Sequence, residues 1–405
     1  MVIKPLGEII NVLTDYHANG AYKKLKDNVE LLEQEEFALM IRTTNLEAQD
    51  YENNLIYITK KAYDFLSKSK VYPNDLIMNK IANAGAIYFM PDLNRPVSLG
   101  MNLFLIRVNT KKANPFYVYS YLKENESYVK SFASGSTTKT ITKDDVKKLK
   151  ILLPPLAEQE KIAEILSTWD KAIATTEKLI DASQQQKKAL MQQLLTGKKR
   201  LLDDSGKPFE GEWEWLKASE LFKTVSKKNN SDSEELLSVT QDQGVLPRKI
   251  LERRVVMPDG STKGYKLVVP GNFIISLRSF QGGLEYSRYR GLVSPAYTVL
   301  EPVKPINNEF YKQYYKSYNF IGHLAVAVIG IRDGKQISYS DFSFLKLPYP
   351  KVKEQQKIAA VLTNADKEIE LLQAKLAHLK DEKKALMQQL LTGKRRVKVD
   401  ENVAA

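Results

Sequence analysis

Residues 187–198 read KKALMQQLLTGK, and residues 383–394 read the same twelve letters. The second copy lies 196 residues after the first, and the match continues upstream at this offset without a gap. The upstream matches include Pro154 and Pro350, Glu158 and Glu354, Gln159 and Gln355, and Ile162 and Ile358. Residues further upstream match far less. The chain therefore alternates two variable blocks with two copies of one constant segment.

Each constant segment predicts a long coiled-coil helix. Its apolar residues follow alternating steps of four and three, which is the a/d seam of a coiled coil. A proline-rich stretch precedes each segment, and Gly197 or Gly393 follows it, as is typical of helix starts and stops. The predicted seam residues are Ile162, Leu166, Trp169, Ile173, Ile180, Leu190 and Leu194 in the first copy, and Ile358, Leu362, Ile369, Leu372, Leu376, Leu379, Leu386 and Leu390 in the second.

Two such helices in one chain can cover each other's apolar stripe. The chain leaves the end of the first helix, builds a variable block and returns, so an antiparallel pair is the simplest arrangement. We expect one variable domain at each end of this pair, related by pseudo-twofold symmetry. If the helix ends are flush, paired residue numbers sum to about 552, which would place the Lys383 ammonium over the Trp169 ring.

The variable blocks are expected to be α/β (α+β) domains. We place the blocks at residues 1–152 and 201–348, and the constant segments at 153–200 and 349–405. The blocks mix β-rich runs at 104–108, 266–269 and 273–275 with helical stretches at 115–123 and 310–320. Residues 74–77 and 271–274 each read as a turn followed by a strand, so the two blocks are predicted to share a framework.

Composition favours a soluble protein with an anionic partner. The chain has 405 residues, 43% of them hydrophobic, and a net charge of +13. Such an excess of positive charge favours binding to a polyanion such as DNA, although a basic surface can also simply aid solubility. The chain has no cysteine, so it has neither disulfides nor thiolate metal sites and suits a reducing cytosol.

No segment of the sequence predicts membrane insertion or export. The most apolar stretch, residues 323–331, is too short to cross a bilayer. The first residues lack a basic leader followed by an apolar core. We therefore expect a cytoplasmic protein.

Polar loops after the paired strands are candidates for DNA contact. Arginine can bind guanine or phosphate, and asparagine and glutamine can pair with adenine. A charged, solvated strand edge is the plainer alternative. Further candidates lie in the polar loop before each constant segment, where amides and hydroxyls could bind phosphates, although such loops are also common turns. The candidates are Asn79, Lys80, Asn83, Ser136, Thr137, Thr138 and Lys139 in the first block, and Arg278, Ser279, Gln281, Arg288, Tyr289, Arg290, Arg332 and Lys335 in the second.

Near their C-termini the helices carry more apolar surface than a two-stranded seam needs. The additional residues are Met191 and Leu195 in the first helix, and Met387 and Leu391 in the second. This surface either accepts a partner helix at each end or is covered by the chain's own domains.

No catalytic constellation is found. The sequence has no phosphate-binding GxxxxGK[ST] loop and no HExxH motif, and its three histidines are scattered singly. Residues 114–117 read NPFY, which is similar to the NPPY of adenine methyltransferases but lacks the second proline, so we interpret it as a helix start. We therefore expect a non-catalytic protein that binds no cofactor or metal itself.

The constant segments resemble a known family. Residues 153–162 read LPPLAEQEKI, with a degenerate copy at 347–358, and together with the alternating organisation they resemble the DNA specificity subunit of type I restriction-modification systems. The resemblance implies that the variable blocks are target recognition domains that read the two halves of a split, asymmetric site in double-stranded DNA. It also implies two methyltransferase subunits bound to the helices and an ATP-driven translocase-nuclease subunit that could join. S-adenosylmethionine, ATP and Mg²⁺ would belong to these partners.

Geometry agrees with this interpretation, and alternatives remain. A helix of the expected length would measure roughly 50 Å, or about 15 base pairs, enough for two short half-sites. The alternatives are a coiled-coil scaffold with paired protein-binding domains, a subunit of a methylation-only system, and a fused single-chain enzyme, which would need the motifs that are absent.

Overall fold

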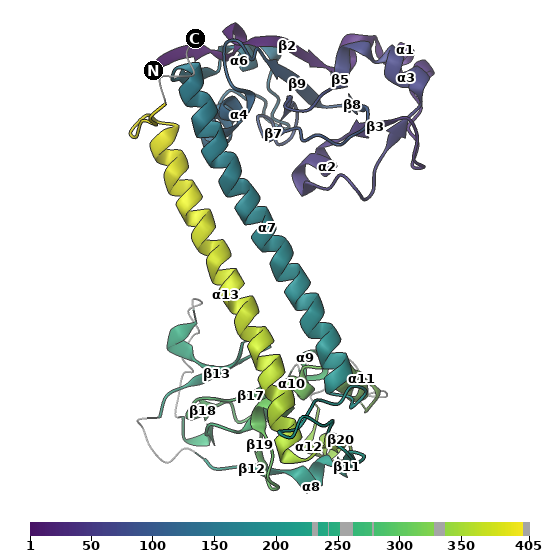
Figure 1. Cartoon of the computed structure of the whole chain (residues 1–405), viewed down its shortest axis with the longest axis vertical. Coiled ribbons are helices and arrows are strands. Elements are labelled where there is room, and N and C mark those ends of the chain that lie inside the picture. The colour runs from purple at the N-terminus through teal and green to yellow at the C-terminus, as the bar shows by residue number, and fades with distance from the viewer. Residues whose placement is uncertain (229–233, 242, 252–261, 278, 328–336, 400–405) are drawn as a thin grey trace. The chain divides into compact units, whose positions relative to one another are not determined.

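The computed structural model describes residues 1–228, 234–241, 243–251, 262–277, 279–327 and 337–399. The chain divides into two compact units (Figure 1). Each unit combines one variable block with a part of each of two long helices, whereas the sequence-based boundaries separated helices from blocks. Unit 1 comprises Met1–Thr175 and Leu376–Ala405, and unit 2 comprises Thr176–Lys375.

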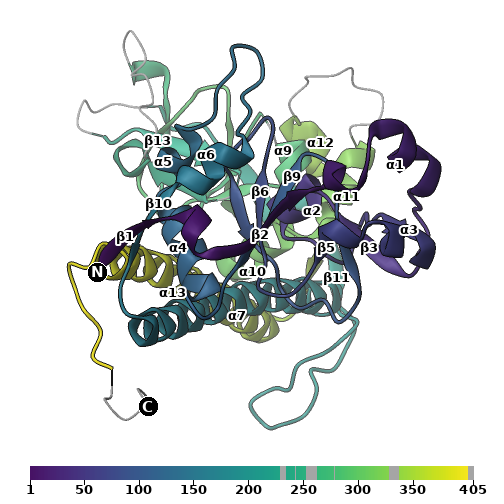
Figure 2. The same ribbon diagram turned by 90° about the horizontal axis from the view of Figure 1, so that it is seen from above.

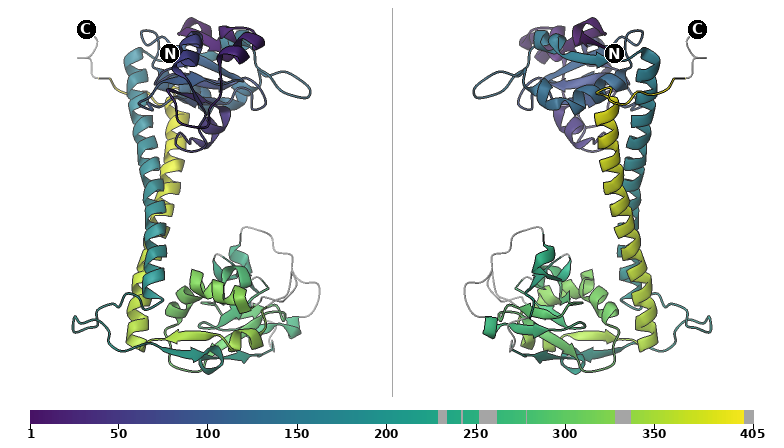
Figure 3. Two further views of the ribbon diagram at one scale, coloured as in Figure 1. Left: turned by 90° about the vertical axis from the view of Figure 1, so that its right-hand side faces the viewer. Right: turned by 90° about the vertical axis from the view of Figure 1, so that its left-hand side faces the viewer.

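The constant segments form the long helices α7 (Leu156–Leu194) and α13 (Val352–Leu390). In unit 1 the start of α7 packs beside the end of α13, and in unit 2 the end of α7 packs beside the start of α13 (Figure 3). The helices therefore run antiparallel within each unit, as predicted. Each is followed by a glycine in the left-handed region, Gly197 (φ 72°) and Gly393 (φ 74°), a conformation that favours glycine.

Ion pairs between the two helices define their register. Lys383 pairs with Asp170 in unit 1, and Lys187 pairs with Asp366 in unit 2. The residue numbers of both pairs sum to 553, one more than predicted. The expected contact of Lys383 with the ring of Trp169 is wrong. The ammonium group reaches the neighbouring carboxylate instead, because a charged acceptor binds it more strongly than a ring does.

All predicted seam residues are buried or half-buried, while most residues between them are exposed. Burial is complete where the helices enter the two hydrophobic cores, at Ile162 and Leu166 in unit 1 and at Ile358 and Leu362 in unit 2. Each such side chain contributes about 1.5–3 kcal/mol of hydrophobic stabilisation. The helices are thus part of the cores on which the variable blocks are built.

Both units contain the same four-stranded antiparallel sheet, which confirms that the blocks share a framework. Its strand order is β2-β9-β6-β7 in unit 1 and β12-β19-β16-β17 in unit 2. The turns before β6 and β16 are those that the sequence aligned. The bounds are β2 (Ile10–Asp15), β9 (Leu103–Val108), β6 (Leu76–Asn79), β7 (Ile87–Phe89), β12 (Phe222–Val225), β19 (Thr298–Pro302), β16 (Phe273–Ile275) and β17 (Glu285–Tyr286).

A second shared feature is a two-stranded antiparallel pair that leads into each long helix. In unit 1, β1 (Val2–Pro5) pairs with β10 (Lys150–Leu153), which directly precedes α7 (Figure 2). In unit 2, β11 (Glu214–Lys217) pairs with β20 (Lys346–Tyr349), which directly precedes α13. Each helix start is therefore anchored to its own block.

Outside this framework the units differ. Unit 1 adds a mixed sheet of order β4-β3-β8-β5, and unit 2 has the two-stranded pairs β13-β14 and β15-β18.

The single helix expected at 310–320 is in fact two helices, broken at Lys316 and Ser317. The bounds are β3 (Ala38–Ile41), β4 (Tyr57–Ile58), β5 (Lys70–Val71), β8 (Val97–Leu99), β13 (Leu237–Thr240), β14 (Gly244–Pro247), β15 (Lys266–Val268), β18 (Gly291–Val293), α1 (Tyr22–Asn28), α2 (Thr43–Ala48), α3 (Lys60–Phe65), α4 (Pro115–Glu124), α5 (Glu126–Lys130), α6 (Lys143–Lys148), α8 (Ala218–Leu221), α9 (Ser279–Gly282), α10 (Asn308–Tyr315), α11 (Tyr318–Ala327) and α12 (Tyr339–Ser343).

A buried glutamine fixes each block to the start of its long helix. The side-chain oxygen of Gln159 accepts a hydrogen bond from the backbone N–H of Asn114 (2.9 Å), and that of Gln355 accepts one from Asn307 (2.8 Å). These asparagines cap α4 and α10. Because an unpaired amide would be costly in the core, this contact gives both blocks the same orientation on their helix starts.

An arginine beyond the end of each helix binds a carboxylate at the start of the other. Arg396 donates two hydrogen bonds to Glu158 (2.8 and 2.6 Å), and Arg200 donates two to Glu354 (2.6 and 2.8 Å). The hydrogen bonds from Arg396 lower the pKa of Glu158, although burial opposes this shift. Glutamates and arginines occupy equivalent positions in the two copies, so the constant segment is complementary to itself in an antiparallel pair.

Candidate nucleic-acid interface

In unit 1 two loops that were separate candidates for DNA contact in the sequence lie side by side in the structure. One follows β6 and carries Lys80 and Asn83, and the other is the hairpin at residues 134–140. Ile81 pairs with Thr140 as a β-bridge between them. Together with α2, which lies against the first loop, these segments form what we call the unit 1 edge: residues 43–48, 79–83 and 134–140.

The hairpin presents its polar side chains to solvent. Ser136, Thr137, Thr138 and Lys139 are all exposed. Gly135 permits the tight turn, because it has a φ of 122° and a Cβ at this position would lie 2.4 Å from a backbone oxygen. Exposed hydroxyls, amides and an ammonium group at a loop tip can reach phosphate oxygens, as the sequence suggested.

Asn79 does not fit its predicted role. Its side chain is buried at the end of β6, where it accepts a hydrogen bond from the Thr43 hydroxyl (3.2 Å) and donates one to the Tyr88 hydroxyl (3.2 Å). Both contacts are internal, so Asn79 connects β6 to α2 and is not available to a ligand.

Lys80 is half-exposed and already paired. Its ammonium group lies 3.2 Å from Asp15, and Lys143 reaches the same carboxylate at 3.3 Å. Burial would raise the pKa of Asp15, but hydrogen bonds and charges from the two lysines outweigh it and hold that pKa below its usual value. Two cations on one carboxylate leave a net positive charge at the unit 1 edge, which suits an anionic ligand.

Asn83 contacts Glu47, a residue that was not among the candidates from the sequence. Its amide donates a hydrogen bond to Glu47 on α2 (3.3 Å), and the Tyr88 hydroxyl donates another to the same oxygen (3.4 Å). Burial and the charge of Glu47 raise the pKa of Tyr88 to about 12, so this phenol remains a donor at neutral pH. Neither contact has a local sequence signal, because the partners come from distant parts of the chain.

In unit 2 the predicted arginines are exposed but paired with carboxylates. Arg288 lies 2.7 Å from Glu309, and Arg290 lies 2.6 Å from Glu234. Tyr289 lies between them and is 37% exposed. This arrangement matches the charged strand edge that the sequence left open as the plainer alternative, although exposed surface pairs of this kind are weak and can rearrange around a ligand.

A cleft of about 590 Å³ opens beside Arg288 and Tyr289 in unit 2. Its walls combine amides, phenols and charges of both signs, which are groups that can contact bases and phosphates. They include Gln241, Gln243, Tyr286, Lys312, Lys367 and Glu370.

The remaining candidates in unit 2 divide into three groups. Ser279 is buried, and its hydroxyl accepts a hydrogen bond from the backbone N–H of Ser276 (2.8 Å), so it shapes the loop and does not face a ligand. Gln281 is exposed and remains a candidate. Arg278, Arg332 and Lys335 lie outside the described residues.

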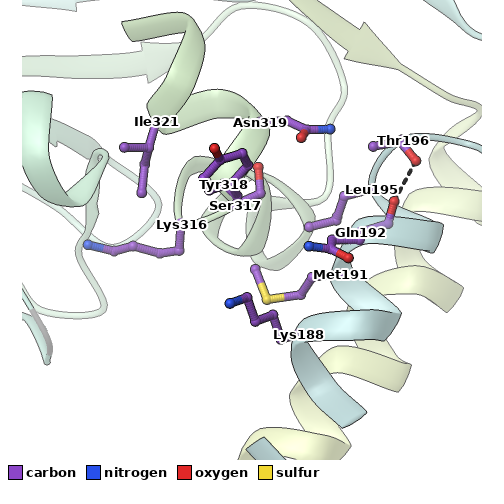
Figure 4. A pocket seen from close by; sticks show the side chains of 10 residues that line it. All are labelled: Lys188, Met191, Gln192, Leu195, Thr196, Lys316, Ser317, Tyr318, Asn319 and Ile321. Carbon is purple, nitrogen blue, oxygen red and sulfur yellow. Dashed lines mark hydrogen bonds between the residues drawn. The ribbon is translucent and has the colours of Figure 1, made fainter. Parts of the chain in front are cut away.

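The proposed partner surface is partly covered by the chain itself. Leu195 and Leu391 are buried in the cores of units 2 and 1, so they present almost no surface to a partner, and this part of the prediction needs correction. Met191 and Met387 are half-buried at the margins of these cores. Beside Met191, a mainly apolar pocket of about 310 Å³ opens between the end of α7 and the turn from α10 to α11 (Figure 4). Its other lining residues are Lys188, Gln192, Leu195, Thr196, Lys316, Ser317, Tyr318, Asn319 and Ile321.

Neither a metal centre nor a membrane segment is found in the described part of the chain. The described residues contain no group of three or more His, Asp or Glu side chains that could hold a metal ion. Among the described helices, none is sufficiently long and apolar to span a bilayer.

Comparison with known proteins gives two matches to one family model. The model describes the type I restriction modification DNA specificity domain, and it matches residues 1–183 and again residues 210–381. The two matches follow the internal duplication of the chain. They also cover both framework sheets and all of the variable blocks except residues 201–209.

Two curated proteins and one solved structure extend this likeness. The proposed MjaX specificity subunit of a type I restriction enzyme from Methanocaldococcus jannaschii is 30% identical over 323 residues, 74% of this chain and 72% of the relative. The MjaVIII specificity subunit from the same organism is 28% identical over 336 residues, 78% of each chain. A crystal structure of the S subunit of a type I restriction-modification system from M. genitalium aligns with a TM-score of 0.59 at 15% identity and covers 96% of each chain.

Proposed function

This chain belongs to the family of type I restriction-modification DNA specificity proteins, and we propose that it reads a split site in duplex DNA, with one unlike half recognised by each unit. One observation carries the proposal: both units have the same four-stranded framework sheet but present different loops beside it. A shared framework places both loop sets in similar positions, and different side chains on them select different bases.

The positive charge of the chain supplies the affinity for DNA that this role needs. The net charge is +13, and the unit 1 edge and the unit 2 cleft both expose cations and amides. Contacts of lysine and arginine with phosphates release counterions and position the protein on the duplex. Base contacts from the same loops then provide the selectivity.

We further propose that the long helices set the spacing between the two half-sites. Both α7 and α13 are continuous over 39 residues and contribute to both units. Length is therefore the property of the helices that would determine the number of unread base pairs between the halves.

Methylation and cleavage are assigned to partner subunits in this proposal. Two methyltransferase subunits would bind the helix ends, using the exposed parts of Met191 and Met387 and the pocket in Figure 4. Lysine, methionine and glutamine recur at the corresponding positions 384, 387 and 388 of α13, so each unit offers a similar half of such a surface. S-adenosylmethionine, ATP and Mg²⁺ would bind to these partners, and a translocase-nuclease subunit could complete the complex. The complex would function in the cytoplasm.

The test is to co-express the chain with a methyltransferase subunit and to map methylated adenines in the DNA of the host. The expected result is one motif with two short, unlike halves around a fixed gap. Methylation by the chain alone would indicate a fused enzyme instead. Methylation without any motif that depends on this chain would favour a scaffold and contradict the proposal.

A further inference from the structure

Glu47 is a carboxylate in a surface that otherwise suits an anionic ligand. It lies on α2 within the unit 1 edge and is exposed. Lys80 and Lys143 both engage Asp15, and no cation among the described residues forms an ion pair with Glu47. A phosphate would be repelled by this group, so its presence in a DNA-binding surface weakens binding unless it accepts a hydrogen bond from the DNA.

A chain of hydrogen bonds holds one oxygen of Glu47 in place. The hydroxyl of Thr43 donates to Asn79, the amide of Asn79 donates to Tyr88, and the hydroxyl of Tyr88 donates to Oε1 of Glu47. Asn83 donates to the same oxygen from the other side (3.3 Å). The described residues provide no hydrogen bond to Oε2, which is left as an oriented acceptor at the surface.

Folding gains little from the two contacts that Glu47 itself makes in this network. The contacts of Glu47 are to an exposed carboxylate and measure 3.3 and 3.4 Å, so their contribution to stability is small. Two donors from different segments nevertheless restrict the rotamers of a side chain that would otherwise be mobile in water. A pre-oriented acceptor loses less conformational entropy when it binds a ligand.

We propose that Glu47 is a specificity-determining residue that accepts a hydrogen bond from the N4 amino group of cytosine in the half-site read by unit 1, an inference that rests on the proposed function. Glutamate accepts from cytosine N4 in the major groove. Adenine also carries an amino group, but its N7 acceptor lies beside that group and repels a carboxylate. Phosphate repulsion and the free acceptor thus together favour cytosine at one position.

The test compares the DNA sequences that the full chain, co-expressed with a methyltransferase subunit, enriches from a pool of random duplexes. Glu47→Ala is expected to lower the preference for cytosine about 10-fold at one position of one half-site, with the other half-site unchanged. Asn83→Ala removes one donor to Glu47 and should weaken the preference at the same position by less. Glu8→Gln removes an exposed negative charge outside the unit 1 edge, and its motif should equal that of the unaltered chain.

The results of this test distinguish a failure of the role of Glu47 from a failure of the proposed function. An unaltered chain that enriches no motif contradicts both. A split motif that Glu47→Ala reproduces with the same preference at every position contradicts the role of Glu47 and leaves the proposed function standing. Because Glu47 is exposed, the variant should fold, and equal thermal unfolding midpoints of Glu47→Ala and the unaltered chain will verify this.

Discussion

Glu158 and Glu354 show how single side chains fix each long helix within its unit. Each carboxylate lies at the start of one helix and receives two hydrogen bonds from an arginine beyond the end of the other. Glu354 is almost fully buried and also accepts a hydrogen bond from the Trp213 indole (3.1 Å). A buried carboxylate that loses its cation is strongly destabilising, because its charge is then uncompensated.

Arg200→Ala is therefore expected to lower the free energy of unfolding of unit 2 by about 3 kcal/mol. Lys199→Ala removes an exposed neighbouring cation and should change it by less than about 0.5 kcal/mol. Urea denaturation followed by tryptophan fluorescence measures both, since Trp213 reports on this site. Equal stability of the two variants would contradict a structural role for the pair.

Glu158 predicts how the stability of unit 1 depends on pH. Arg396 lowers its folded pKa below the ordinary value of 4.5. The pair is thus fully stabilising above about pH 4.5, and its contribution is lost as the pH falls through the lower folded pKa. Glu158→Gln should flatten the decline of thermal midpoint between pH 5 and pH 3, as measured by calorimetry.

The matched control is Glu160→Gln, an exposed change two residues along α7. It should keep the decline of the unaltered chain. A decline that is the same with and without the Glu158 carboxylate would show that this ion pair does not contribute to the acid sensitivity.

The ion-pair and hydrogen-bond partners of these polar side chains could not be predicted from the sequence. Arg288 and Arg290 were recognisable as candidate DNA contacts, but their carboxylates, Glu309 and Glu234, come from other elements. The same is true of Asn79, whose burial depends on Thr43 and Tyr88. Residue type indicates what a side chain can bind, whereas the fold decides whether it is free to do so.

At the scale of elements, the duplication made the long helices the most predictable part of the fold. Identical segments must share a seam, and two copies in one chain can cover each other only if the chain turns back. The register was predicted to within one residue, because the helix ends are equivalent. The break at Lys316 and Ser317 was missed, since no proline or glycine marks it.

Cross-linking tests the antiparallel register directly. Because the chain has no cysteine, the pair Asp170→Cys and Lys383→Cys would contain the only two thiols. A short bismaleimide should link them within one chain in high yield. The pair Asp170→Cys and Asp366→Cys places thiols at equivalent positions of the two copies and should not be linked. The reverse pattern would require parallel helices.

At the scale of the whole molecule, the net charge of +13 predicts a strong dependence of DNA binding on salt. About six phosphate contacts would reduce the affinity for random duplex roughly 10³-fold between 50 and 200 mM salt.

Lys139→Ala should reduce the slope of log K against log salt by about 1, because its exposed ammonium lies in the unit 1 edge. Lys111→Ala, which is exposed outside that edge, should leave the slope unchanged. Fluorescence anisotropy over a salt series measures both, and an affinity that is insensitive to salt would contradict phosphate binding.

The two different units are proposed to read two half-sites, with the helices setting the gap between them. This proposal is tested most directly by inserting one heptad after Thr176 in α7 and one after Leu376 in α13, next to the boundary between the units on each helix. Seven residues add about 10 Å to each helix, or about 3 base pairs of duplex. The methylation motif of this variant should keep both halves and gain about 3 unread base pairs. An unchanged gap, or a motif with altered halves, would contradict the account.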